Sequence, residues 1–300
     1  METHLKVGVM GAGVFAGYHV SKVAAHDRAT LIGVFDRNED KARDVAKRNG
    51  GEVFLEAEKL ASVCDALIIA VPGSDHASLA KLGLTEGCHL LIEKPMATSV
   101  VDCDDIIGLA RSKDRILQIG HQERVVMNAI GLQTILDRPT ELQITRHSGP
   151  SDRNLDTSVV MDLMIHDLDL VLSLFGEPDW VNTEAAKRVY SEDWDEVRAE
   201  LGYADFTAYP SASRNAEPSR QWTLRYETGT VQIDFGQKTL THDTAYALNA
   251  AFGDDPSVQD SLATAFDQFV KACLDGTPPL ATGEEGRAAV RVARMIEGTP

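Results

Sequence analysis

The first 120 residues alternate short apolar runs with stretches of helical spacing, and this alternation constrains the fold more than any other feature. The runs that predict strands are residues 5–10, 29–35, 66–71, 89–93 and 116–120. Helices are predicted between them, from residue 14 to about 25 and over 40–48, 75–83 and 102–111. Near-continuous apolar strands that alternate with helices are typical of a parallel sheet covered on both faces. We therefore expect an α/β fold with a doubly wound parallel sheet.

The chain changes style near residue 120, where the regular alternation ends. Helices are predicted at residues 158–175, 258–274 and 284–296. A hairpin is predicted from residues 221–226 and 230–235, with a turn at 227–229. The acidic segment 191–196 is expected to be a solvated loop. This half therefore predicts an α+β domain with an antiparallel sheet, and we place the two domains at 1–120 and 121–300.

The composition narrows the range of partners. Of 300 residues, 43% are hydrophobic and 25% charged, which is close to an ordinary globular protein and excludes a disordered or fibrous one. The net charge of −17 disfavours nucleic acid and anionic membranes as partners, although a local pocket can still bind a small anion. No apolar run approaches the roughly 20 residues that span a bilayer, and the first residues lack a signal pattern. The four cysteines show no metal-binding spacing, so we expect no metal and a cytoplasmic location.

A glycine-rich turn follows the first predicted strand. Gly11, Gly13 and Ala16 fit the pattern G-x-G-x-x-A, which lets the backbone approach a pyrophosphate at the start of a helix. Asp36 ends the second strand about 20 residues later, where a carboxylate can accept hydrogen bonds from ribose hydroxyls. These residues predict a dinucleotide site. Asp36 favours NAD, whereas the neighbouring Arg37 leaves NADP open, because an arginine there can bind the extra phosphate.

Two further segments carry groups suited to catalysis. Lys94 follows the strand 89–93, at the sheet edge where ligands bind in such folds, and the Lys94–Pro95 bond can be cis. Asp162 and His166 are four residues apart on a predicted helix, and Asp169 follows His166 by three. A carboxylate that orients an imidazole suits a general base. The alternatives are a solvated surface lysine and a structural His–Asp pair.

Read in order, the glycine turn, Glu93-Lys94-Pro95 and the segment from Asp162 to His166 resemble the Gfo/Idh/MocA oxidoreductases, over nearly the whole chain. The resemblance implies a Rossmann domain, then a domain with a large, open, mainly antiparallel sheet through which members form dimers or tetramers. It implies that Lys94 holds substrate and nicotinamide together and that Asp162 and His166 form the catalytic dyad. The residues that it implies for the cofactor are Gly11, Gly13, Val14, Phe15, Ala16, Asp36, Arg37, Pro72, Ser74, His76, Glu93 and Lys94.

A narrower resemblance concerns the substrate. Segments 120–124, 151–154 and 160–169 are similar to the UDP-N-acetylglucosamine 3-dehydrogenase subgroup, although residues 125–128 depart from its usual Arg-Phe-Asn-Pro. Arg124 and Arg153 could bind a diphosphate, because guanidinium forks match phosphate oxygens. The predicted substrate residues are Lys94, His121, Arg124, Arg153, Asp162 and His166. The alternatives are a dehydrogenase of a free sugar or inositol-like polyol, and a non-catalytic regulator that senses the dinucleotide.

Overall fold

The computed structural model describes residues 4–150 and 155–299, which form two units. The first unit contains the chain up to Gln122 together with Asp260–Arg287, and the second contains Glu123–Gln259 and the chain from Ala288 onward. The domain boundary at residue 120 remains a prediction. In one segment the structure departs from it, because Asp260–Arg287 packs with the first unit instead of the second.

The first unit is built on a six-stranded sheet in which every pairing is parallel. Its strands, in spatial order, are β3 (Glu52–Phe54), β2 (Ala29–Phe35), β1 (Leu5–Met10), β4 (Ala66–Ile69), β5 (His89–Ile92) and β6 (Leu117–Ile119). The order reverses between β1 and β4, which is the switch point where such folds bind ligands. This arrangement confirms the doubly wound parallel sheet.

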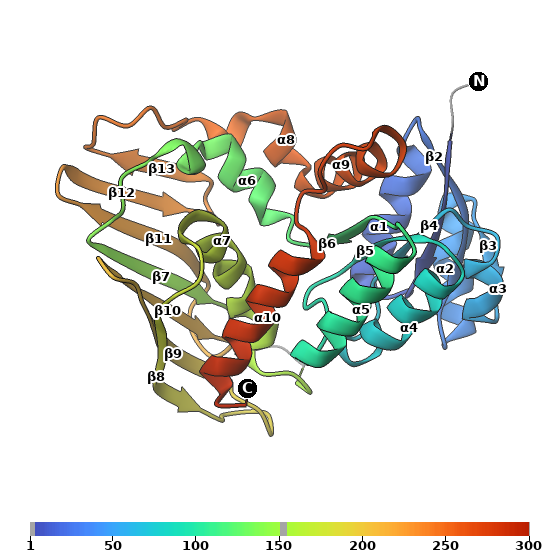
Figure 1. Ribbon diagram of the computed structural model, residues 1–300, viewed down its shortest axis with the longest axis horizontal. Helices are drawn as coiled ribbons and strands as arrows, with labels where there is room; N and C mark the ends of the chain where they lie inside the picture. The colour runs from blue at the N-terminus through green and yellow to red at the C-terminus, as the bar shows by residue number, and fades with distance from the viewer. Residues whose placement is uncertain (1–3, 151–154, 300) are drawn as a thin grey trace. The chain divides into compact units, whose positions relative to one another are not determined.

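Helices cover this sheet (Figure 1). They are α1 (Val14–Ala25), α2 (Glu39–Asn49), α3 (Ala57–Ala61), α4 (Gly73–Thr85), α5 (Val100–Ser112) and α9 (Ser261–Asp275). The apolar side of α9 explains why the segment after residue 260 joins this unit: Phe266, Phe269 and Val270 are buried in one core with residues of β1 and α1. Gln118 of β6 adds polar contacts, since its side-chain amide donates to the Ala265 carbonyl and accepts from the Leu280 N–H.

The second unit is built on a seven-stranded sheet. Its strands, in spatial order, are β13 (Thr239–His242), β12 (Gly229–Asp234), β11 (Ser219–Tyr226), β7 (Glu141–His147), β10 (Thr207–Ser213), β9 (Glu196–Gly202) and β8 (Trp180–Lys187). Only the β7–β10 pairing is parallel, so the expected large, mainly antiparallel sheet is confirmed. The hairpin expected around residues 227–229 is the β11–β12 pair.

The two faces of this larger sheet differ in polarity. Leu142 and Ile144 of β7 and Trp222 and Leu224 of β11 are buried under the helical layer, whereas the residues that alternate with them are polar and more exposed. The helices of this unit are α6 (Glu123–Ile130), a π-helical turn (Val160–Met164) that runs into α7 (Ile165–Phe175), α8 (Pro256–Gln259) and the end of α10 (Gly283–Glu297). Helix α7 lies against the sheet (Figure 1), where its Asp167 accepts hydrogen bonds from Arg146 of β7 and Trp222 of β11. Short 3₁₀ turns lie at Leu132–Thr134 and Phe252–Asp254.

The acidic segment 191–196 is a loop up to residue 195, since β9 begins at Glu196, and its expected solvation is wrong for one residue. Asp195 is fully buried. Its carboxylate accepts hydrogen bonds from the N–H groups of Val189, Tyr190 and Ser191 and from the Ser191 hydroxyl. Burial alone would raise the pKa of Asp195, but these hydrogen bonds outweigh burial and lower it to about 2. The carboxylate therefore organises the turn between β8 and β9.

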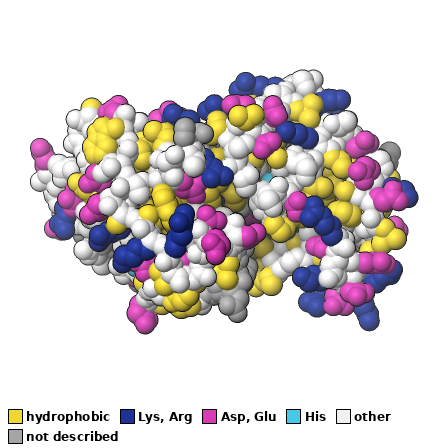
Figure 2. Space-filling model, turned by 90° about the horizontal axis from the view of Figure 1, so that it is seen from below, with side chains coloured by type: hydrophobic (Ala, Val, Ile, Leu, Met, Phe, Trp, Pro, Cys, Tyr) yellow, Lys and Arg dark blue, Asp and Glu magenta, His cyan; other side chains and the backbone are white. Residues whose placement is uncertain are grey.

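The surface of the described residues adds few constraints on the partners of the protein. Figure 2 shows acidic and basic side chains interspersed over one face, with apolar side chains between them. Within residues 4–150 and 155–299, no helix has the length and apolar character needed to cross a membrane. The same residues contain no group of three His, Cys, Asp or Glu side chains placed to hold a metal ion. All four cysteines, which lie in the described ranges, are free thiols.

Candidate active site

The glycine turn joins β1 to α1 at the switch point of the parallel sheet. Gly11 has φ of +118°, and a Cβ there would lie 2.3 Å from the Ala70 carbonyl oxygen of the neighbouring strand end. Gly13 caps α1 in an extended conformation, and a Cβ there would meet nothing within 4 Å. Ala16 is fully buried against the sheet. Gly11 is therefore required by the fold, whereas Gly13 keeps the space before the helix N-terminus open.

Asp36 links the end of β2 to this turn. One carboxylate oxygen accepts a 2.7 Å hydrogen bond from the Ala12 N–H, and the other accepts one of 2.8 Å from the Asn38 N–H. The negative charge is thus fixed beside the glycine turn. Arg37 points into solvent with a side chain that is 78% exposed, and its guanidinium forms a 2.8 Å ion pair with Asp75 at the start of α4. This ion pair engages Arg37, the arginine that left NADP open as a cofactor.

The residues predicted from the loop after β4 surround the start of α4. Pro72 is the N-cap residue of α4, and Ser74 is exposed in its first turn. His76 is buried, and its two ring nitrogens lie 2.7 Å from the Pro95 carbonyl and 2.9 Å from the Val71 carbonyl. Burial lowers the pKa of His76. His76 therefore braces the loop that carries Lys94 and Pro95, a structural role that its predicted cofactor role did not include.

Lys94 lies at the carboxyl end of β5, as expected, and the Lys94–Pro95 bond is cis. The preceding Glu93 is buried, with one oxygen 2.7 Å from His19 Nε2 and the other 3.3 Å from the Lys94 N–H, which donates to it. Gly120 packs against the same carboxylate, since a Cβ at Gly120 would come within 2.9 Å of it. The Glu93 carboxylate therefore contacts protein groups, one of which is the backbone N–H of Lys94, and this does not favour its predicted contact with the cofactor.

Two predicted substrate residues near the end of β6 have different surroundings. His121 is buried in the first unit and directly follows Gly120. Arg124 belongs to α6 in the second unit, where it forms a buried bidentate ion pair with Asp169 at 2.7 and 2.8 Å. This pair argues against Arg124 as a diphosphate ligand. Both oxygens of the Asp169 carboxylate accept hydrogen bonds from Arg124. Arg153, the other predicted arginine, lies outside the described residues.

Asp162 and His166 lie where a π-helical turn runs into α7, and both are partly exposed. Isolated π turns occur often at functional sites. His166 Nδ1 lies 3.9 Å from Glu123 Oε1, at the beginning of α6. The third predicted catalytic residue, Lys94, belongs to the first unit. The structure thus keeps Asp162 and His166 on one helical segment and Lys94 at a strand end, as expected from the sequence.

A buried cluster of charges beside His166 was not predicted. Arg146 of β7 binds Glu123 with contacts of 3.0 and 2.5 Å and Asp167 with contacts of 2.5 and 3.1 Å. The Trp222 indole N–H donates to Asp167 at 2.9 Å, and Arg220 donates to Glu123. Glu123 at the start of α6 and Arg146 in β7 are 23 residues apart and meet only in the folded unit, so no spacing pattern could reveal them.

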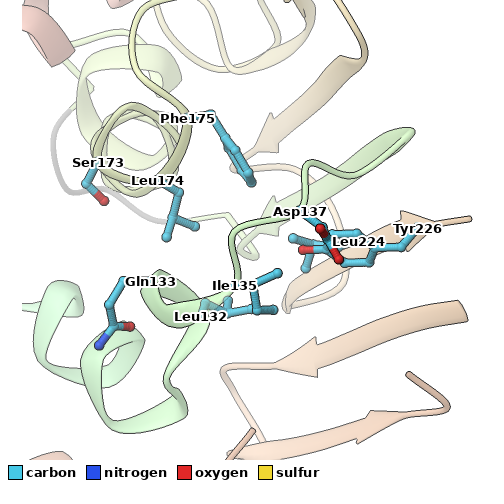
Figure 3. Close-up of a pocket in the computed structure, with 9 residues that line it drawn as sticks. All are labelled: Leu132, Gln133, Ile135, Asp137, Ser173, Leu174, Phe175, Leu224 and Tyr226. Carbon is cyan, nitrogen blue, oxygen red and sulfur yellow. The ribbon is translucent and has the colours of Figure 1, made fainter. Parts of the chain in front are cut away.

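A small pocket in the second unit lies away from these residues (Figure 3). The side chains that line it come from the end of α7, the segment after α6 and strand β11, and they are Leu132, Gln133, Ile135, Asp137, Ser173, Leu174, Phe175, Leu224 and Tyr226. Its volume of about 70 Å³ is far below the roughly 300 Å³ at which small-molecule sites begin. This pocket is therefore too small for a sugar nucleotide.

The first unit fits a dinucleotide on structural grounds. The open space at Gly13, the helix N-terminus behind it and the fixed carboxylate of Asp36 are the features that such a ligand requires. Val14 and Phe15 begin α1 beside this space, and Val14 is 62% exposed. We therefore keep Gly11, Gly13, Val14, Phe15, Ala16 and Asp36 as the predicted contacts of the cofactor.

Comparisons with known proteins agree with this arrangement. The sequence model described as the oxidoreductase family with an NAD-binding Rossmann fold matches residues 5–121, and that of the GFO/IDH/MocA C-terminal domain matches residues 133–232. The UDP-N-acetylglucosamine 3-dehydrogenase of Acidithiobacillus ferrooxidans is 32% identical, over 98% of this chain and 96% of that protein. The myo-inositol 2-dehydrogenase of Thermotoga maritima is 23% identical, over 95% and 93% of the two chains.

Solved structures give the same result for the fold. The structure of the UDP-N-acetylglucosamine 3-dehydrogenase GnnA from Acidithiobacillus ferrooxidans matches with a TM-score of 0.88 and 31% identity, over 98% of this chain and 96% of that one. GenD2 from gentamicin A biosynthesis, solved in complex with NAD, matches with a TM-score of 0.84 and 20% identity, over 99% and 94% of the two chains. At that lower identity the second likeness concerns the fold alone.

Proposed function

The chain belongs to the Gfo/Idh/MocA family of NAD-binding oxidoreductases, and from this premise we propose that it oxidises a secondary hydroxyl of a nucleotide sugar. The leading candidate is the C3 hydroxyl of UDP-N-acetylglucosamine. The observation that carries this choice is the 32% identity to a UDP-N-acetylglucosamine 3-dehydrogenase over 98% of the chain. An enzyme is supported over a dinucleotide-sensing regulator because Lys94, Asp162 and His166 are all present.

NAD binds, in this proposal, across the glycine turn, with its ribose at Asp36. The fixed negative charge of Asp36 would repel a 2′-phosphate, which favours NAD over NADP. When bound, the nicotinamide supplies the acceptor for a hydride from the carbinol carbon. Pro72, Ser74 and the buried His76 shape the start of α4 on the other side of the switch point.

His166 acts in this mechanism as the general base that takes the proton of the substrate hydroxyl. Asp162, on the same helical segment, helps to orient the imidazole. Lys94 donates a hydrogen bond to the same substrate oxygen and stabilises its developing negative charge, as a fixed cation does in a site with little water. His121 is proposed to line the substrate site near the end of β6. A positioned general base contributes a factor of roughly 10²–10⁴ to the rate.

The test is formation of reduced nicotinamide with UDP-N-acetylglucosamine, free N-acetylglucosamine and myo-inositol as separate substrates. We expect turnover with the nucleotide sugar. His166→Asn should lower kcat about 10²- to 10⁴-fold with NAD affinity unchanged. Lys94→Ala should lower kcat by a similar factor and raise KM, since Lys94 contacts substrate in both ground and transition states. Preference for myo-inositol would favour the polyol alternative. NAD binding without turnover on any substrate would favour the regulator.

The surroundings of the enzyme are part of the proposal. We infer a dimer or tetramer that associates through the polar, uncovered face of the seven-stranded sheet, and a cytoplasmic location in which the free thiols stay reduced. Light scattering at micromolar concentration measures the mass in solution, and a monomer would contradict the association. The measured mass also separates a dimer from a tetramer.

A further inference from the structure

The charge cluster beside His166 has no part in the mechanism above. Glu123, at the start of α6, places Oε1 3.9 Å from His166 Nδ1, which is an ion-pair distance slightly beyond hydrogen-bond reach. The two residues are 43 positions apart in the sequence but lie in the same unit. The side chains of Glu123 and His166 are 13% and 15% exposed, so bulk water screens this contact only weakly.

Glu123 is held as a carboxylate by two arginines. Arg146 donates to both of its oxygens, at 3.0 and 2.5 Å, and Arg220 donates to Oε1. Burial alone would raise the pKa of Glu123. The charges of Arg146, His166 and Arg220 outweigh that effect, so its pKa lies well below the usual range. Glu123 is therefore ionised across the pH range in which histidine titrates.

The position of this carboxylate is also fixed. Arg146 is 7% exposed and is anchored on its other side by Asp167, which in turn accepts from the Trp222 indole. Asp167 of α7 and Trp222 of β11 thus fix Arg146 of β7, and Arg146 in turn holds Glu123 in place. A fixed negative charge 3.9 Å from Nδ1 favours the neutral tautomer that carries its proton on that nitrogen.

The charged residues around His166 come from four parts of the second unit. Glu123 belongs to α6, Arg146 to β7, Arg220 to β11, and the helical segment of His166 itself adds Asp162, Asp167 and Asp169. Asp169 is paired with Arg124, and Asp167 with Arg146. Glu123 shares its charge with Arg146 and Arg220, so its effect on His166 is moderated and not abolished.

We propose that Glu123 is a positioning residue for His166, through its carboxylate opposite Nδ1. This inference rests on the proposed function. The carboxylate keeps the proton of the neutral imidazole on Nδ1, which leaves the Nε2 lone pair for the substrate. In the reaction the substrate O–H bond would break and an Nε2–H bond would form, while bound oxidised NAD would supply the acceptor for the carbinol hydride as the C=O bond forms. The imidazolium that results lies next to Glu123, which stabilises it.

The direct measurement is the pKa of the His166 imidazole by NMR with ¹⁵N-labelled histidine, in the full chain without substrate. The spectrum of His166→Asn identifies its signals among those of the nine histidines. Glu123→Gln preserves shape and removes the charge. Because an anion at 4–6 Å raises the pKa of a neighbouring base, we expect the pKa of His166 to fall by about 1, the low end of the usual range. The acid limb of the kcat/KM profile should move down with it, and kcat should fall about tenfold.

Arg220→Gln is the matched control with the opposite sign. Its side chain is 40% exposed, and it removes a positive charge while leaving Glu123 in place. The pKa of His166 should rise. Glu123→Asp retains the charge and should keep most of the wild-type pH profile. If Glu123→Gln fails to fold, because Arg146 and Arg220 lose a partner, Arg220→Gln carries the test alone.

The outcomes separate this inference from the proposed function. A His166 pKa that is unchanged in Glu123→Gln, or in Arg220→Gln where only that variant folds, would overturn the role of Glu123, whatever the activity. A loss of activity in Glu123→Gln without movement of the pH limb would mark a purely structural residue. If His166→Asn keeps wild-type turnover, the general-base role fails, and the NMR result still reports whether Glu123 acts on the imidazole.

Discussion

Two glycines of one turn have different roles at the scale of single residues. Gly11 is needed by the protein itself, because its positive φ and the Ala70 carbonyl leave no room for a side chain. Gly13 is under neither constraint, since its φ of −70° suits any residue and its Cβ direction is open. The sequence pattern treats both as parts of one motif, but the structure separates a folding requirement from a binding requirement.

This difference gives a prediction for cofactor binding. Gly13→Val should abolish NAD binding by calorimetry, because the branched side chain fills the space before α1, while the free energy of unfolding changes by less than about 1 kcal/mol. Gly11→Ala should instead destabilise the protein by at least about 1–3 kcal/mol. Gly17→Ala, at another glycine of α1 with open space, is the control and should keep wild-type NAD affinity. Normal NAD affinity in Gly13→Val would refute the site.

Among elements, the predictions from sequence were accurate where burial is complete. Strands β1, β4 and β5 are almost fully buried, so their apolar runs were visible. Strands β7 to β10 were not located individually. Strands β7, β9 and β10 alternate buried residues with Thr, Ser, Glu, Gln and Arg, and β8 contains no buried residue, so none of them shows a continuous apolar run. The helix predicted over 258–274 is divided, because Asp260 caps α9 by accepting from the Ala263 N–H.

The residues of the candidate site also differ in how far the sequence could predict them. Lys94, Asp36 and the glycine turn were predictable because strand ends and turns fix their places in the sheet. The roles of Glu93 and Arg124 could not be predicted, because their partners, His19 and Asp169, come from helices that only the fold brings close.

The loop between β8 and β9 gives a prediction at the scale of an element. Asp195→Asn removes a charge that accepts four hydrogen bonds, so it should lower the free energy of unfolding by about 1–3 kcal/mol at pH 7. The lowered pKa means that this stabilisation is present above pH 3.8, the ordinary value, and is lost as the pH falls toward 2. Urea unfolding of both proteins should therefore show a difference that narrows in acid. A difference that is constant down to pH 2 would contradict this role.

For the whole molecule, the first unit needs two distant parts of the chain. Residues 5–121 match the Rossmann family model, yet Phe266, Phe269 and Val270 of α9 lie in the same core. A fragment of residues 1–122 should therefore fail to give a cooperative thermal transition or to bind NAD. The same fragment joined by a Gly/Ser linker to residues 260–287 should recover both, as measured by circular dichroism and calorimetry. A stable, NAD-binding fragment 1–122 would show that α9 is dispensable.

The late position of α9 has a consequence for synthesis. The strands and helices up to Gln122 leave the ribosome early, but the helix that closes their core begins at Ser261. At about 5–20 residues per second, the gap of roughly 140 residues corresponds to a delay on the order of 10 s. During that time the apolar surface of α1 and β1 that α9 will cover is exposed on the nascent chain. A holding chaperone that binds apolar segments would find its best target there, and the first unit would be completed only after residues 260–287 have been synthesised.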